Sequence, residues 1–178
     1  VNAHPSAATA PLIALRDVAK VYGEGQAAMQ LEALARQSLT SQWKDILVDE
    51  IEAADSYLKK ENEQRWKIIS SKFVKQGLDD ISSGKDRSAL ALQFHSWLIS
   101  CISRLVEKLS GTTGIRDVVL SGGSMQNGLL LEGLLFALTR QGLTPYTGVS
   151  IPINDGGVSV GQALIGGMQH VSRSTNEG

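Results

Sequence analysis

The sequence has little of several features that mark particular protein classes. Its 178 residues include one cysteine, Cys101, which excludes an internal disulfide framework and is typical of a reducing, cytoplasmic compartment. The formal net charge is −1, so there is no basic excess for binding nucleic acid. No uninterrupted apolar run reaches the roughly 18 residues of a membrane span. We therefore expect neither nucleic acid nor membrane as a partner.

Residues that bind transition metals are also scarce. The three histidines, His4, His95 and His170, form no His-x-x-x-His pair, and Cys-x-x-Cys does not occur. This chain alone therefore does not make a complete transition-metal site. His95 follows Phe94 in an apolar segment, which favours a structural histidine over a ligand. Cys101 has no neighbouring base in the sequence and is expected to pack as a small apolar residue.

The first two-thirds of the chain is predicted to be mostly helical. Apolar residues recur with a period of about 3.6 residues over 24–39 and again over 65–84. The segment between them, 42–64, has the spacing of a helix, but its stretch DILVDEI also permits a strand. A long apolar helix over 87–111 is expected at the centre of the fold, with Gly111 ending it.

The last third has a different pattern. From Arg116 onward, short apolar runs enter glycine pairs and helical segments follow, in the order strand, loop, helix, strand, loop, helix. This order is typical of an α/β fold. We expect the α/β lobe to occupy 23–170. A loose arm with a short helix over 1–22, which lacks the features of a signal peptide, would precede it, and a disordered tail over 171–178 would follow.

The first glycine loop, SGGSMQN, follows the strand that ends at Leu120. Gly122 and Gly123 lack Cβ atoms, so a phosphate or ribose could approach the backbone amides closely where the next helix begins. Asn127 could hydrogen-bond a sugar or a base. The alternative is a simple strand-to-helix turn in which Asn127 caps the helix, and for this loop alone the alternative is favoured.

The second glycine loop contains Asn154, Asp155, Gly156 and Gly157. The Asp155 carboxylate could ligate a metal, and the glycine amides could wrap phosphates. The alternative is an aspartate that caps the following helix. Two such loops on adjacent strand ends would face one crevice, which is the usual ligand position in an open α/β sheet.

Four blocks together carry a resemblance to a known family. They are EGQAAMQLEALA, FH within a long helix, VVLSGGSMQN, and IPINDGGVSVGQA. From about Gly23 to Met168 the chain resembles the C-terminal part of the HypF-type carbamoyltransferases of nickel-iron-hydrogenase maturation, most weakly over 40–85.

The resemblance implies an actin-like, ribonuclease H-like fold and a specific chemistry. Such enzymes make carbamoyl-adenylate from carbamoyl phosphate and ATP, and then pass the carbamoyl group to a C-terminal cysteine of HypE. Carried over, Gly122, Gly123, Asn127, Gly156 and Gly157 would contact the nucleotide. Asp155 would ligate a divalent metal together with two histidines of a His-rich motif.

The chain also departs from the resembled family. The His-rich motif is missing, and Gly128 follows Gln126-Asn127 where the family usually has arginine, so a charge near the nucleotide is lost. The chain would thus be a natural half that needs a partner chain, a shortened piece, or a remnant. The functional alternative is a non-catalytic binding or regulatory module. Because an unpaired lobe exposes apolar surface, we also expect self-association, for example as a homodimer.

Overall fold

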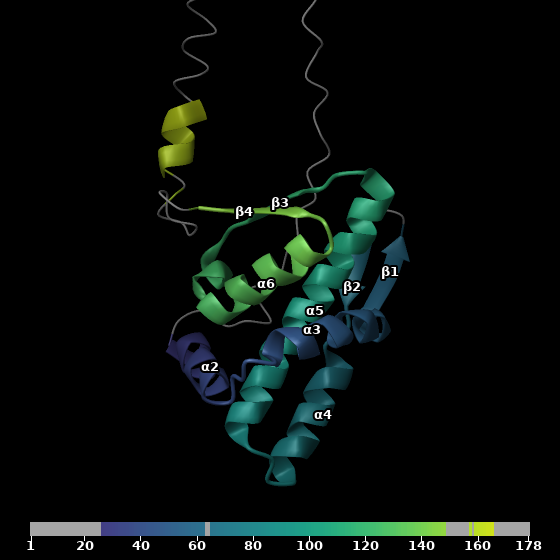
Figure 1. Ribbon diagram of the computed structural model, residues 1–178, viewed down its shortest axis with the longest axis vertical. Coiled ribbons are helices and arrows are strands. Elements are labelled where there is room, and N and C mark those ends of the chain that lie inside the picture. The colour runs from purple at the N-terminus through teal and green to yellow at the C-terminus, as the bar shows by residue number, and fades with distance from the viewer. Residues whose placement is uncertain (1–25, 63–64, 149–156, 158, 166–178) are drawn as a thin grey trace, which may run out of the picture.

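The computed structural model describes residues 26–62, 65–148, 157 and 159–165 (Figure 1). The predictions for the arm, for Asp155, for Gly156 and for the tail lie outside these residues. Residues 159–165 form a short helix. The elements before it are α2 (Gln26–Gln37), α3 (Trp43–Ala53), η1 (Ala54–Tyr57), β1 (Leu58–Asn62), β2 (Arg65–Ile68), α4 (Ser71–Ser82), α5 (Arg87–Thr113), β3 (Asp117–Leu120), η2 (Gly123–Gln126), α6 (Gly128–Arg140) and β4 (Thr144–Thr147).

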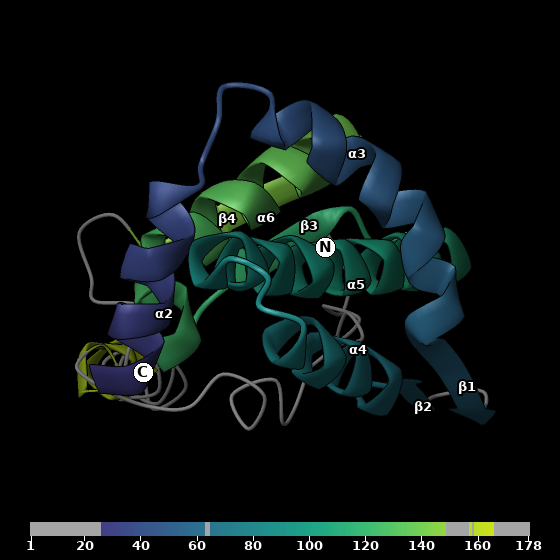
Figure 2. The same ribbon diagram turned by 90° about the horizontal axis from the view of Figure 1, so that it is seen from below.

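The long helix α5 is the centre of the fold, as predicted. It packs against α2, α3, α4 and α6, and in Figure 2 it runs between α6 on one side and α4 on the other. By length and composition α5 could cross a membrane, but 61% of its most apolar stretch is buried inside the protein, as in a core helix. Cys101 lies in this core with no exposed surface, and burial raises the pKa of its thiol to about 12. The prediction that Cys101 packs as a small apolar residue is confirmed.

The ends of α5 are fixed by its caps. The Asp86 carboxylate accepts a hydrogen bond from the Ala89 amide at 2.9 Å, which satisfies one of the free amides of the first turn. The helix continues past Gly111, so the prediction that Gly111 ends it is wrong. Gly114, with φ 74°, is the left-handed residue that stops the helix, and its amide donates to the Ser110 carbonyl at 2.8 Å.

The middle of the chain is partly helix and partly hairpin. The ambiguous segment begins as the helix α3 and then turns into β1, which pairs antiparallel with β2. Residues 65–68 were expected to begin a helix and instead form β2, so that helix starts only at Ser71. Pairing with β1 overrides the helical spacing, because Trp66 lies across from Lys60 and the ammonium groups of Lys60 and Lys108 lie over its ring.

The last third has the predicted order of strand, loop, helix and strand. β3 and β4 are parallel neighbours, with α6 lying along one face of the pair (Figure 1). Leu120 and Val118 pack in or against the core, whereas Val119 and Tyr146, which are partners in the register, are 73% and 52% exposed. The whole is a mixed α/β fold, as expected.

The contact between η1 and α5 contains a surface ion pair that should respond to acid. Arg104 donates two hydrogen bonds to the Asp55 carboxylate, at 3.0 and 2.7 Å, and the Lys108 ammonium lies 3.0 Å away. Mainly through the Arg104 hydrogen bond, the pKa of Asp55 falls from its ordinary value of 3.8 to about 2.

A lowered folded-state pKa means that Asp55 contributes stability above pH 3.8 and loses it as the pH falls through about 2. We therefore expect Asp55→Asn to be less stable than the unmodified protein near pH 6 and the difference to close by about pH 2. Urea unfolding followed by circular dichroism across this range measures it. A difference that stays constant with pH would contradict the prediction.

Candidate functional site

The ends of β3 and β4 lie at the same edge of the sheet. Leu120 at the end of β3 pairs with Thr147 at the end of β4, and the strands are parallel, so both following segments start side by side. This is the edge at which ligands bind in open α/β sheets. The structure describes the first loop in full. Of the second loop it describes only Gly157, which is half-buried.

The backbone of the first loop is open to its surroundings. Gly122 has φ 102° and ψ 166°, and its carbonyl accepts a hydrogen bond from the Met125 amide at 3.0 Å to close the turn of η2. A Cβ atom added to Gly122 or Gly123 would meet no other atom within 4 Å among the described residues. Gly123 is exposed. A ligand could therefore reach the backbone here without displacing atoms of the described residues.

Asn127 is placed at the end of this loop and caps α6. Its Oδ1 accepts a hydrogen bond from the Leu130 amide at 2.7 Å, and only 6% of the residue is exposed. Its Nδ2 lies 3.2 Å from Nε2 of His95. The helix-cap alternative is thus present in the structure, and a contact between Asn127 and a nucleotide stays a prediction.

His95 is the structural histidine that the sequence suggested. It is fully buried on α5, and its Nδ1 lies 2.8 Å from the Ala91 carbonyl, to which it can only donate. Burial is the main cause that lowers the pKa of His95 below its ordinary value. A neutral ring with its proton on Nδ1 leaves Nε2 as an acceptor for Asn127.

The sequence did not identify Glu32 and Arg36 as residues of the site. These two side chains belong to α2 and contact the start of α6. Oε1 of Glu32 accepts hydrogen bonds from the Leu129 amide at 3.2 Å and from Arg36 Nε and Nη2 at 2.9 and 2.7 Å. The carboxylate is favourable there because a helix start carries partial positive charge. Their spacing of four residues indicates a helical ion pair, but nothing local in the sequence points to Leu129.

Gly128 makes room for this ion pair. A Cβ atom at residue 128 would lie 2.8 Å from Arg36 Nη2 and 3.3 Å from Glu32 Oε1. Gly128 stands where the resembled family usually has arginine. A guanidinium nevertheless lies beside this position, and it comes from α2.

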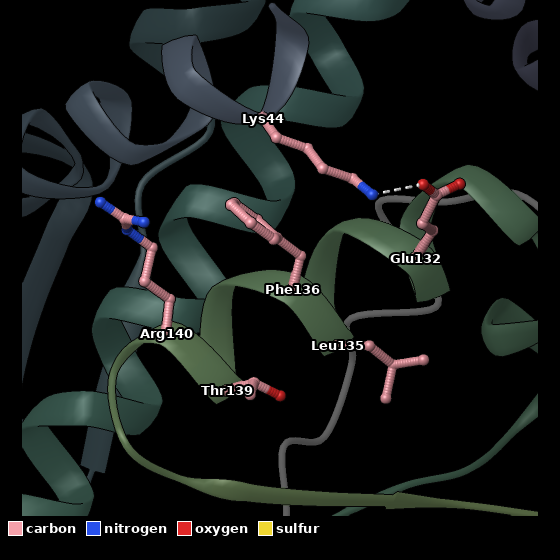
Figure 3. A pocket seen from close by; sticks show the side chains of 6 residues that line it. All are labelled: Lys44, Glu132, Leu135, Phe136, Thr139 and Arg140. Carbon is pink, nitrogen blue, oxygen red and sulfur yellow. Dashed lines mark ion pairs between the residues drawn. The ribbon is translucent and has the colours of Figure 1, made fainter. Parts of the chain in front are cut away.

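Two hollows of the described surface lie away from this loop. One of about 560 Å³ lies on the outer side of α3 and α6, where Lys44 forms an ion pair of 2.8 Å with Glu132 and lies over the ring of Phe136 (Figure 3). Another, of about 210 Å³, lies at the end of α5 near Arg116. Neither is lined by a predicted site residue. Among the described residues, no group of three His, Cys, Asp or Glu side chains could hold a metal ion.

Residues 7–162 match the family described as carbamoyltransferase, Kae1-like domain, second subdomain. The chain is 33% identical over 88 residues (49% of this chain, 11% of the relative) to carbamoyltransferase HypF2 of Cupriavidus necator. It is 30% identical over 148 residues (82% of this chain, 17% of the relative) to carbamoyltransferase HypF of Synechocystis sp..

A solved structure shows the same fold. It is described as the crystal structure of full-length HypF in the phosphate- and nucleotide-bound form, and it matches 81% of this chain and 17% of its own length with a TM-score of 0.64 and 33% identity. The chain thus spans less than a fifth of the length of the HypF proteins that it matches. The family match over residues 7–162 and these relatives show that the chain belongs to the HypF-type carbamoyltransferase family, as the second subdomain of its Kae1-like domain.

Proposed function

We propose that this chain supplies the nucleotide-phosphate side of a HypF-type transferase site, for carbamoyl transfer to a protein cysteine in nickel-iron-hydrogenase maturation. The parallel pair of β3 and β4 supports the proposal, because the two strands end side by side and no described residue obstructs the backbone of Gly122 and Gly123. A related HypF structure is a phosphate- and nucleotide-bound form.

The chemistry assigned to this chain is the binding of an anion. Backbone amides at Gly122, Gly123, Gly156 and Gly157 would donate hydrogen bonds to the phosphate of ATP or carbamoyl-adenylate. Neutralising that phosphate makes AMP a better leaving group when a thiolate attacks the carbamoyl carbon. In this scheme the acceptor is the cysteine of a HypE-like protein.

A divalent metal would add further positive charge at the phosphate, and Asp155 is the ligand that this chain would contribute. The resemblance implies that the other ligands are two histidines of a His-rich motif, which this sequence does not contain. We propose a separate chain with the His-rich half as their source.

The exposed pair of Val119 and Tyr146 supports a second proposal, that the lobe associates with another chain or with its own copy through the face of the sheet on which these two residues lie.

The proposal predicts a specific loss when Asp155 is replaced. In a complex with a chain that carries the His-rich half, Asp155→Ala should abolish the metal-dependent part of ATP binding, because the carboxylate would no longer hold the cation beside the phosphates. Titration calorimetry with ATP, with and without magnesium, measures it.

Asp79→Ala is the matched control, since it removes an exposed carboxylate from α4. Unchanged affinity in Asp155→Ala would count against the assigned role. If the unmodified complex binds neither ATP nor magnesium, the chain is better explained as a non-catalytic binding or regulatory module. The observation that favours this second function is that the sequence contains no His-rich motif.

A further inference from the structure

We propose that His95 is a positioning residue for the first glycine loop: its Nε2 fixes the orientation of the Asn127 amide, so that the amide oxygen caps α6 and holds the end of the loop. The residues lie 32 positions apart, on α5 and at the start of α6. The consequence for ligand binding rests on the proposed function, whereas the positioning itself does not.

Three hydrogen bonds in series leave one assignment of donors and acceptors. The Ala91 carbonyl can only accept, so Nδ1 of His95 donates to it at 2.8 Å. The Leu130 amide can only donate, so Oδ1 of Asn127 accepts from it at 2.7 Å. Nδ2 of Asn127 therefore faces Nε2 of His95 at 3.2 Å as a donor, and a neutral His95 ring offers the acceptor.

The opposite orientation of the amide is excluded by the same groups. Turned over, the Asn127 side chain would point its NH₂ group at the Leu130 amide and its oxygen at the lone pair of Nε2. Both contacts are repulsive. His95 is 0% exposed and Asn127 is 6% exposed, so water has little access to relieve them.

The surroundings of His95 favour a neutral ring. Burial is the largest cause that lowers its pKa. Among the described residues, the charges of Glu32 and Arg36 on α2 act on this pKa in opposite directions, and the two side chains are hydrogen-bonded to each other. If Nε2 did take up a proton, it would turn that proton toward the Asn127 NH₂ group and break the series.

The series reaches the candidate site through the backbone of η2. The backbone N–H of Asn127 donates to the Ser124 carbonyl at 3.2 Å, and the backbone N–H of Met125 donates to the Gly122 carbonyl at 3.0 Å. Asn127 therefore ends the turn that Gly122 begins. Holding its side chain against α5 fixes one end of the loop whose amides would meet the phosphate.

The first test uses the unmodified chain, so no variant needs to fold. Nitrogen-15 NMR of the imidazole rings distinguishes a ring protonated on Nδ1 from one protonated on Nε2. At neutral pH we expect His95 to carry its proton on Nδ1 with Nε2 bare. A ring protonated on Nε2 would overturn the proposal.

The second test asks whether His95 controls the cap. In His95→Leu we expect amide hydrogen exchange at Leu130 to be roughly tenfold faster, as for the loss of one capping hydrogen bond. Ser103→Ala, a change at a buried residue two turns further along α5, should leave Leu130 unaltered. Unchanged exchange in a folded His95→Leu, or equal acceleration in both variants, would contradict the role.

Asn127→Asp gives a readout that a merely space-filling role would not move. One carboxylate oxygen can still cap Leu130 while the other faces Nε2, so the pKa of His95 in this variant should rise by at least about one unit. An unshifted His95 titration would mean that the two side chains are not coupled.

Binding of ATP with magnesium to the complex with the His-rich half should weaken about tenfold in His95→Leu. If the unmodified complex binds no ATP, the proposed function fails, and the NMR and exchange results still decide the role of His95.

Discussion

Gly133→Val is expected to destabilise the protein by about 3 kcal/mol or to prevent folding, because it overfills the contact between α6 and α5. A Cβ atom at Gly133 would lie 2.3 Å from Cδ1 of Ile99 and 3.1 Å from Cη2 of Trp43. Both neighbours are buried, at 0% and 3% exposure, so neither can move aside into solvent. Among the described glycines, Gly133 has the least room for a side chain, and its neighbour Ile99 belongs to α5.

Urea unfolding of Gly133→Val and Gly77→Val measures the effect with a matched control. Gly77 also lies in a helix, but a Cβ atom there would meet no described residue within 4 Å, so valine should change the free energy of unfolding by less than about 0.5 kcal/mol. Adding Ile99→Ala to Gly133→Val should recover part of the loss, because it removes the atom in closest contact. Equal losses at the two glycines would show that packing is not the cause.

Gly122→Ala should destabilise the first glycine loop by about 1–3 kcal/mol without any steric clash. With φ 102° and ψ 166°, Gly122 has a backbone conformation that is essentially restricted to glycine. Because a Cβ atom there would meet nothing within 4 Å among the described residues, we assign the cost to the backbone conformation. Thermal unfolding measures the loss of stability, and the amide shifts of Ser124 and Met125 report the change in the turn.

Gly123→Ala is the control, since Gly123 has no positive φ and the same open space. We expect little change in its stability, within about 0.5 kcal/mol. If Gly123→Ala is stable but binds ATP more weakly in the complex with the His-rich half, the added methyl group obstructs the bound ligand and does not disturb the fold. A Gly122→Ala protein as stable as Gly123→Ala would contradict the backbone argument.

The elements that the sequence predicts best are those with a repeating pattern and a clear end. α2, α5 and α6 have apolar residues on one or more faces, and β3 is a short apolar run that enters two glycines. The prediction of a helix at residues 65–68 was wrong, because a strand is stabilised by its partner. The environment of Trp66 depends on Lys60 across the hairpin and on Lys108 from α5. The predicted end of α5 was wrong because Gly111 and Gly114 lie close together in the sequence, and of these two only Gly114 takes the left-handed conformation.

The candidate site was predicted one residue at a time but not as a network. The local pattern favours a structural His95 and offers a capping Asn127 as the alternative to the predicted nucleotide contact, which stays a prediction. The bond between them joins residues 32 positions apart, and the bond from Leu129 to Glu32 joins residues 97 positions apart. Such pairs depend on how α2 and α5 pack around the start of α6, and no spacing within one segment encodes that.

The buried thiol of Cys101 makes the chain its own reporter of unfolding. It is the single sulfhydryl of the sequence, has no exposed surface, and has a pKa raised to about 12, so an alkylating reagent meets neither an accessible nor an ionised sulfur in the native protein. Alkylation can therefore proceed only while α5 is separated from its neighbours. The rate of modification at saturating reagent thus gives the opening rate of the core under native conditions, without denaturant and without an introduced label.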